Sequence, residues 1–297
     1  MPEPIFGRLI TAMITPFDAA GELDLPRTAA FVDRLIEGGT DSIIVCGTTG
    51  ESPTVFYPQK LDVIRTVVQT AAGRVPVIAN VGDNCTQDTI DFLQDVEELG
   101  VDGFMAVVPY YNKPPQEGLY RHFKAIAAST ELPVVLYNIP SRCVVNMLPE
   151  TTLRLARECP NIVAVKEASG DIDQVKAILD GAPDGFYVYS GDDSFTLPLM
   201  EAGGAGVIST ISNVAPARMK EIVDAAAAGD WTRASSLNEK LLPLMNGLFE
   251  TTNPILVKEA LALDGFPVGG VRLPLVEATP AQSERLAALM RQTGVLD

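Results

Sequence analysis

The sequence predicts an α/β fold, a (β/α)8 TIM barrel followed by a C-terminal helical extension. Short apolar runs typical of buried strands recur at intervals of roughly 20–30 residues, and a helical pattern follows each run. Eight consecutive strand–helix units favour a closed barrel over a doubly wound sheet. A doubly wound sheet would need a glycine-rich loop after the first strand, where this chain has Thr15-Pro16-Phe17-Asp18.

The predicted elements alternate along the first part of the chain. Thr86 is expected to cap one helix, and Pro149 is expected to open another. Strands are expected at 9–14, 42–46, 75–81, 103–109, 133–139, 162–168, 186–190 and 206–210. Helices are expected at 26–38, 58–72, 86–99, 116–130, 149–158, 171–181, 194–202 and 216–228.

Strand-like runs cease after residue 229. The remaining chain reads as three helices, the last of which begins with the capping box Thr279-Pro280-Ala281-Gln282. These helices are expected at 230–249, 254–263 and 279–293. We therefore expect a barrel domain at 1–229, which would carry the catalytic site, and a C-terminal helical domain at 230–297.

Composition and charge exclude several classes of function. The 297 residues are 47% apolar and 20% charged, as in a soluble globular protein, and the net charge of −16 argues against nucleic-acid or anionic-membrane partners. No run of 18 apolar residues and no signal-peptide pattern is present, so a cytoplasmic location is expected. The cysteines form no C-x-x-C pair and His122 is the single histidine, so we expect neither a metal nor a cofactor.

Lys166 is the most informative residue in the chain. It ends the apolar run Ile162-Val163-Ala164-Val165, and an ammonium group is costly to remove from water. The lysine could pair with a carboxylate or extend to solvent at the strand end. It could also have a lowered pKa, so that its neutral amine attacks a carbonyl and forms a Schiff base.

The loops that follow the predicted strands carry the other unusual side chains. In a barrel these loops form the active-site face. The stretch Gly47-Thr48-Thr49-Gly50-Glu51 offers hydroxyls and backbone N–H groups that suit a small carboxylate, although an ordinary Ser/Thr turn would look the same. Tyr110 and Tyr111 follow the fourth strand and could serve the site, a subunit interface or both.

Strands five and seven add further polar groups to this face. Tyr137 and Arg142 end strand five, and a guanidinium suits a bidentate carboxylate contact. Asp192 and Asp193 follow strand seven, where they are expected to serve the N-terminus of the next helix. An amine, several phenols, threonines and an arginine suit imine chemistry on a 2-oxo acid. An ordinary lysine pKa of about 10.4 leaves little neutral amine, which burial and Arg142 would increase.

These residues fall in motifs that resemble a known enzyme family. The chain is similar, from about residue 5 to its C-terminus, to the pyruvate-dependent class I aldolases typified by dihydrodipicolinate synthase and N-acetylneuraminate lyase. The motifs that carry the resemblance are G-T-T-G-E at 47–51, P-Y-Y-N at 109–112, Y-N-I-P-S-R at 137–142, V-K-E-A at 165–168 and G-D-D at 191–193.

The resemblance implies a role for each of these positions. Lys166 would form the imine with pyruvate, and Tyr137, Thr48 and Tyr111 would relay protons. Thr49 would bind the pyruvate carboxylate, Arg142 would receive the carboxylate of L-aspartate 4-semialdehyde, and the backbones of Gly191 and Ile208 would line the site. The implied product is 4-hydroxy-tetrahydrodipicolinate, in lysine and diaminopimelate biosynthesis.

The resemblance also implies an oligomer and a possible departure in regulation. The expected assembly is a homotetramer, a dimer of dimers, with Tyr110 and Tyr111 at the tight interface and Tyr111 entering the neighbouring subunit's site. Family members inhibited by lysine carry histidines where this chain has Tyr57 and Lys60, so inhibition is expected to be weak.

Two other readings of the site stay open at this point. One is a pyruvate lyase of the same family that acts on a sugar acid or hydroxy-oxoglutarate, against which Arg142 argues. The other is a non-catalytic barrel that binds a metabolite, against which the intact set of Lys166, Tyr137, Tyr111 and Thr48 argues.

Overall fold

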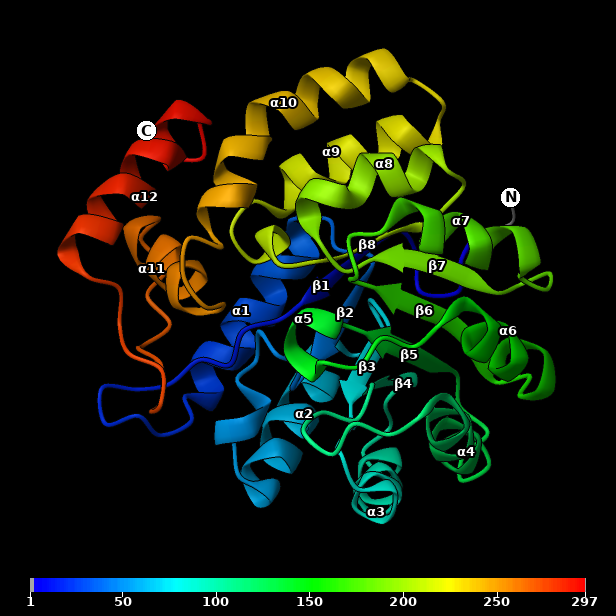
Figure 1. Cartoon of the computed structure of the whole chain (residues 1–297). Helices are drawn as coiled ribbons and strands as arrows, with labels where there is room; N and C mark the ends of the chain where they lie inside the picture. The colour runs from blue at the N-terminus through cyan, green and yellow to red at the C-terminus, as the bar shows by residue number, and fades with distance from the viewer. Residues whose placement is uncertain (1–2, 297) are drawn as a thin grey trace.

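A computed structural model describes residues 3–296 and contains a closed barrel of eight parallel strands. Each strand pairs with its neighbours in the sequence, and β8 closes the barrel on β1 (Figure 1). The predicted fold class is therefore confirmed. The strands are β1 (Leu9–Ala12), β2 (Ser42–Val45), β3 (Val77–Asn80), β4 (Gly103–Val107), β5 (Val134–Asn138), β6 (Ile162–Glu167), β7 (Tyr187–Ser190) and β8 (Gly206–Ser209).

Helices follow the strands at the predicted positions and surround the barrel (Figure 1). The barrel helices are α1 (Leu25–Glu37), α2 (Tyr57–Ala71), α3 (Thr86–Glu97), α4 (Gln116–Ala127), α6 (Pro149–Glu158), α7 (Ile172–Gly181), α8 (Thr196–Glu201) and α9 (Pro216–Ala227). The sequence did not predict the short helix α5 (Pro140–Cys143) or the 3-10 turns η1 (Ser52–Thr54), η2 (Asp193–Phe195) and η3 (Ile211–Asn213). All four lie in the segments that follow strands, so they shape the active-site face.

Alternation along the strands separates two apolar layers. On β6, Ala164 packs with residues inside the barrel, whereas Val165 packs in the larger cluster between the strands and the helices. Side chains two residues apart on a strand point to the same face. Lys166 therefore points into the barrel, at the end of β6 where the active-site loops begin.

Three further helices form the C-terminal extension: α10 (Trp231–Gly247), α11 (Ile255–Leu263) and α12 (Pro280–Gln292). Helix α10 packs against α9 and α8, and α11 packs against α12 (Figure 1). The predicted capping box is present, because Thr279 and Gln282 exchange side-chain and backbone hydrogen bonds. The predicted division at residue 229 falls in the turn between α9 and α10, and its status as a domain boundary stays a prediction.

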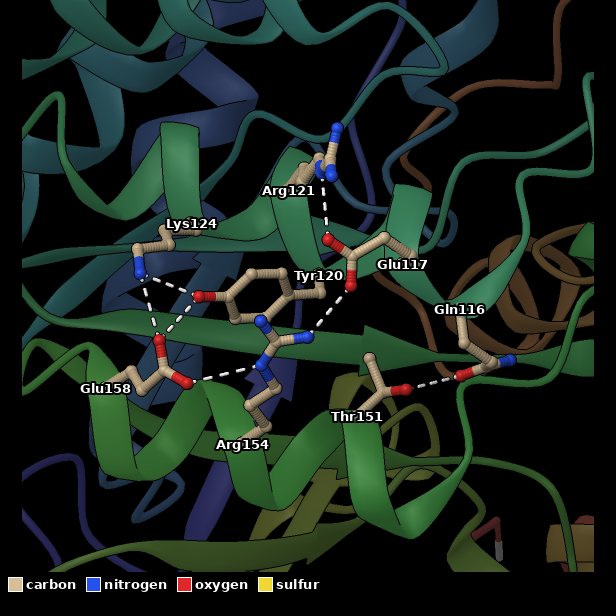
Figure 2. Close-up of polar contacts among 8 residues, drawn as sticks. All are labelled: Gln116, Glu117, Tyr120, Arg121, Lys124, Thr151, Arg154 and Glu158. Carbon is tan, nitrogen blue, oxygen red and sulfur yellow. Dashed lines mark hydrogen bonds and ion pairs between the residues drawn. The ribbon is translucent and has the colours of Figure 1, made fainter.

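A polar network joins α4 to α6, the helices that flank β5 in the sequence (Figure 2). The Arg154 guanidinium lies 3.4 Å from the centroid of the Tyr120 ring, and the Lys124 ammonium is 2.9 Å from a Glu158 carboxylate oxygen. These charged groups are exposed to solvent, where ion pairs contribute little to stability.

The expected cap at Thr86 is wrong. Helix α3 begins at Thr86 itself, and its hydroxyl lies 2.9 Å from Nδ1 of His122 on α4. A helix cap precedes the first helical residue, so Thr86 stands one residue too late for that role. His122 is buried, and burial lowers its pKa to about 4, so it is a neutral packing residue.

Within residues 3–296, no helix combines the length and apolar character of a bilayer span.

Candidate active site

Lys166 lies inside the barrel with 5% of its surface exposed. It is the register partner of Tyr137 on β5, and its Nζ lies 4.3 Å from the centroid of the Tyr137 ring. Burial lowers the pKa of the Lys166 amine to about 8, against the opposing charge of Asp193 and with the help of Arg142. At pH 7 about a tenth of an amine with this pKa is neutral, far more than for an ordinary lysine, and the neutral form is the nucleophile that imine formation requires.

Tyr137 supplies a protonated phenol beside the amine. The side chain is 4% exposed, and burial raises the pKa of Tyr137 to about 12. The charge of Arg142 and a hydrogen bond with Thr48 act in the opposite direction, because both favour the phenolate. The phenol can therefore donate a proton at neutral pH, and the two neighbours ease its transient loss.

A cavity of about 480 Å³ lies at the barrel mouth, and its lining includes Thr48, Tyr137 and Arg142. Arg142 belongs to α5, the four-residue helix that follows β5 directly, and its side chain is exposed. The cavity lining thus combines a buried phenol and a threonine hydroxyl with an exposed guanidinium. This arrangement suits a small substrate with a carboxylate distant from its reacting carbon.

Gly191 leaves room for the side chain of Lys166. A Cβ atom at position 191 would lie 3.2 Å from both Cγ and Cε of Lys166 and 2.7 Å from Cβ of Ala168. Real Cβ atoms do not approach other atoms as closely as the second distance. A glycine is therefore required where β7 passes the lysine, a role that adds to the expected one.

Ile208 and Thr49 come from β8 and from the loop after β2, two strands that are separated in the barrel by β1. Ile208 is a buried residue of β8 and packs in the inner cluster together with Tyr137. Thr49 follows β2, is 3% exposed, and accepts a hydrogen bond of 2.9 Å from Nδ2 of Asn253. The threonine hydroxyl is thus held by a residue of the C-terminal extension.

The two tyrosines after β4 differ in their surroundings. Tyr110 lines the cavity, and its hydroxyl donates to Oδ2 of Asp83 at 3.1 Å. Tyr111 is 90% exposed and has a φ of 73°, an uncommon value for a residue with a side chain. The loop therefore turns the phenol of Tyr111 away from the cavity of its own chain.

Comparison with known proteins gives the same family that the motifs indicated. Residues 5–293 match the model of the dihydrodipicolinate synthetase family. The chain belongs to this family. It is 52% identical over 293 residues to the 4-hydroxy-tetrahydrodipicolinate synthase of Symbiobacterium thermophilum, with 99% of this chain and 100% of the relative covered.

Solved structures of the dihydrodipicolinate synthetase family share the whole fold. The synthase of Cyanidioschyzon merolae with lysine bound gives a TM-score of 0.97 at 42% identity, covering 99% of this chain and 100% of the other. The chloride-inhibited synthase of Acinetobacter baumannii complexed with pyruvate gives 0.95 at 41% identity, covering 98% and 100%. The predicted lyase activity, formation of 4-hydroxy-tetrahydrodipicolinate, is confirmed for this chain by its near full-length likeness to synthases of that name.

The two aspartates after β7 do not share one role. Asp192 accepts a hydrogen bond from the backbone of Ser194 and so caps the next turn, as predicted. Asp193 is buried and accepts from the backbone N–H groups of Thr210 and Ile211 after β8, so the prediction for it is wrong. Pairing of β7 with β8 brings this turn beside Asp193, a contact that chain order conceals.

The sequence analysis missed a group of residues from the C-terminal extension that contacts the G-T-T-G-E loop. Besides Asn253, Lys258 of α11 pairs with Glu51 at 2.5 Å, and the backbone N–H of Arg272 donates to the same carboxylate at 2.9 Å. A lysine in the apolar segment Ile255-Leu256-Val257-Lys258 is the signal that could have revealed this contact.

Proposed function

We propose that this chain condenses pyruvate with L-aspartate 4-semialdehyde through an imine on Lys166. The observation that carries the proposal is a buried lysine with a lowered pKa, packed against the ring of a buried tyrosine. The A. baumannii relative complexed with pyruvate supports the choice of the first substrate.

The chemistry follows from an amine that lies against a phenol of the cavity lining. The neutral Lys166 amine attacks the ketone carbon of pyruvate, and water leaves as the imine forms. Loss of a methyl proton gives an enamine, whose carbon attacks the aldehyde carbon of the semialdehyde, and the aldehyde oxygen takes a proton. The amino group of the semialdehyde then displaces Lys166 from the imine carbon, which closes the ring and frees the lysine. Tyr137, with Thr48 and Tyr111, would carry the protons.

Each substrate carboxylate has its own partner in this proposal. The Thr49 hydroxyl would bind the carboxylate of pyruvate, with the backbones of Gly191 and Ile208 beside it. Arg142 at the cavity rim would bind the carboxylate of the semialdehyde. A coupled assay tests the substrate pair: we expect turnover with pyruvate and the semialdehyde, and turnover only with a sugar acid or hydroxy-oxoglutarate would overturn the proposal.

We further propose that the active assembly is a homotetramer, a dimer of dimers, in which Tyr111 completes a neighbouring subunit's site. The support is the 90% exposure of Tyr111 beside a cavity lined by Tyr110 of the same loop. The cytoplasmic location expected from the sequence stays a prediction.

Subunit complementation tests the shared site. Tyr111→Phe and Lys166→Ala should each be inactive, and mixing them under conditions of subunit exchange should restore activity. A Tyr111→Phe subunit keeps Lys166 and would receive Tyr111 from its partner, so one intact site forms in the mixed dimer. No recovery despite exchange detected by mass spectrometry would place Tyr111 in its own subunit's site.

A further inference from the structure

The C-terminal extension reaches the carboxylate loop of the barrel at a point far away in the sequence. Asn253 lies between α10 and α11, is 6% exposed, and donates its Nδ2–H to Oγ1 of Thr49 at 2.9 Å. The two residues are 204 positions apart in the chain. The hydrogen bond thus joins a loop of the extension to a hydroxyl of the proposed pyruvate site.

A second contact holds the same loop two residues further on. The Glu51 carboxylate is buried and receives the Lys258 ammonium at 2.5 Å and the backbone N–H of Arg272 at 2.9 Å. Lys258 also donates to the carbonyl oxygen of Gly270 at 2.7 Å. Glu51 has a φ of 54°, in the left-handed region that residues with side chains adopt rarely. The extension thus fixes the loop that carries Thr49.

The polarity of the Asn253 contact determines where the Thr49 proton can point. A threonine hydroxyl has one proton and two acceptor lone pairs. With one lone pair occupied by the Asn253 N–H, rotation about the C–O bond is restricted and the proton is directed away from Asn253. A donor fixed in advance binds a carboxylate without the cost of ordering it.

We infer that Asn253 is a positioning residue for the substrate carboxylate: it orients the Thr49 hydroxyl as a donor, which makes the C-terminal extension part of the pyruvate site. The inference rests on the proposed role of Thr49. It assigns to the extension a contribution to substrate affinity, in addition to its packing against the barrel.

A double-mutant cycle in the full-length chain tests the inference, with the KM of each substrate as the readout. Loss of one oriented hydrogen bond should raise the KM for pyruvate about three- to tenfold in Asn253→Ala, with kcat and the semialdehyde KM unchanged. Thr49→Val should raise the pyruvate KM at least as much. Adding Asn253→Ala to Thr49→Val should have no further effect, because the hydroxyl to be oriented is gone.

The control is Asn246→Ala, which removes an exposed asparagine of the same extension and should leave both KM values as they are. If Asn253→Ala does not fold, Asn253→Ser replaces it, since a serine side chain is too short to span the contact and should raise the pyruvate KM as well. The inference would be overturned if the pyruvate KM of the double variant rose by the product of the two single effects. It would also be overturned if Asn253→Ala changed both KM values equally or left the pyruvate KM unchanged. Failure of the proposed function is seen separately, as a parent protein that forms no reducible imine with pyruvate.

Discussion

Two lysines of this chain are buried to a similar degree, yet their surroundings differ. Lys166 is 5% exposed and Lys258 is 3% exposed, and burial lowers the pKa of each ammonium group to about 8. Lys258 is held between the Glu51 carboxylate at 2.5 Å and the Gly270 carbonyl oxygen at 2.7 Å. Within residues 3–296 Lys166 forms no ion pair, and its amine lies over the ring of Tyr137, a residue of the cavity lining.

A lowered pKa therefore does not by itself identify a lysine as a nucleophile. The ammonium group of Lys258 is directed at the Glu51 carboxylate and the Gly270 carbonyl oxygen, so this lysine serves as a structural link between the extension and the loop. Lys166 has nearly the same burial without an ion pair to any described residue, and its amine lies against Tyr137, which lines the cavity. The two lysines differ in whether the amine is available to react, and this depends on the groups placed around it.

The largest expected effect is on turnover. Lys166→Arg keeps a positive charge but removes the reactive amine, so nearly all condensation activity should be lost. Lys258→Arg keeps the charge that Glu51 requires and should retain measurable turnover. Initial rates from the coupled assay decide the matter, and comparable losses in the two variants would remove the distinction drawn here.

The second effect is on stability, where we expect the substitution of Lys258 to matter more than that of Lys166. Lys258→Met leaves the Glu51 carboxylate buried without a partner, which should lower the free energy of unfolding by about 3–5 kcal/mol. The double variant Glu51→Gln with Lys258→Met should recover much of that loss, since it leaves no uncompensated charge. Urea denaturation followed by circular dichroism measures both.

Lys124, in the exposed network of Figure 2, is the matched control for this stability experiment. Its ion pair with Glu158 is in contact with solvent, so Lys124→Met should leave the urea midpoint unchanged within error. A midpoint shift for Lys258→Met no larger than that of Lys124→Met would show that the buried pair contributes no more than an exposed one.

A third effect concerns Arg142, which affects the Lys166 amine and is assigned to the second carboxylate. Arg142→Ala should raise the KM for the semialdehyde by about one to two decades, the value of a charge-assisted contact, while imine formation with pyruvate continues. Steady-state kinetics with each substrate varied in turn provides the test. An unchanged semialdehyde KM with impaired imine formation would assign Arg142 to pyruvate.

The smallest effect concerns a third lysine, Lys60, which lines both the candidate active-site cavity and an adjoining cavity of about 410 Å³ that Tyr57 also lines. Its Nζ lies 5.4 Å from the centroid of the Phe92 ring, and Asp83, Asp88 and Asp91 line the same cavity. Their carboxylates offset part of the repulsion between Lys60 and a cationic effector. We expect weak inhibition by L-lysine, which Lys60→Gln should strengthen by about one decade, since like charges roughly 10 Å apart repel by about 1.7 kcal/mol at a dielectric of 20. Strong inhibition of the unaltered protein below a millimolar would contradict this.

The sequence predicted the barrel and the core of the site because both depend on local patterns. Apolar runs of strand length identify the eight strands, and the ends of β5 and β6 give Tyr137 and Lys166 a common face without any knowledge of tertiary contacts. The helix α5 was missed because four residues are too few to show a helical period.

Contacts between distant segments could not be predicted from these patterns. Asp193 reaches the turn after β8 because two strands pair, and Asn253 reaches Thr49 across 204 residues because the extension folds back onto the barrel. No local sequence pattern identifies the residues that Asp193 and Asn253 contact. Lys258 did carry a signal, a charge in an apolar helix, of the same kind that identified Lys166.

Reductive trapping tests the central claim, that availability and burial together make Lys166 the nucleophile. The protein is incubated with pyruvate and borohydride over a pH series, and the modified lysine is located by peptide mapping. We predict one adduct, on Lys166, whose rate of formation rises with pH through about 8, because the neutral amine grows as the proton leaves. Lys258, with a pKa lowered to the same value, should stay unmodified. An adduct mainly on Lys258 or another lysine, or no adduct at any pH, would contradict the account.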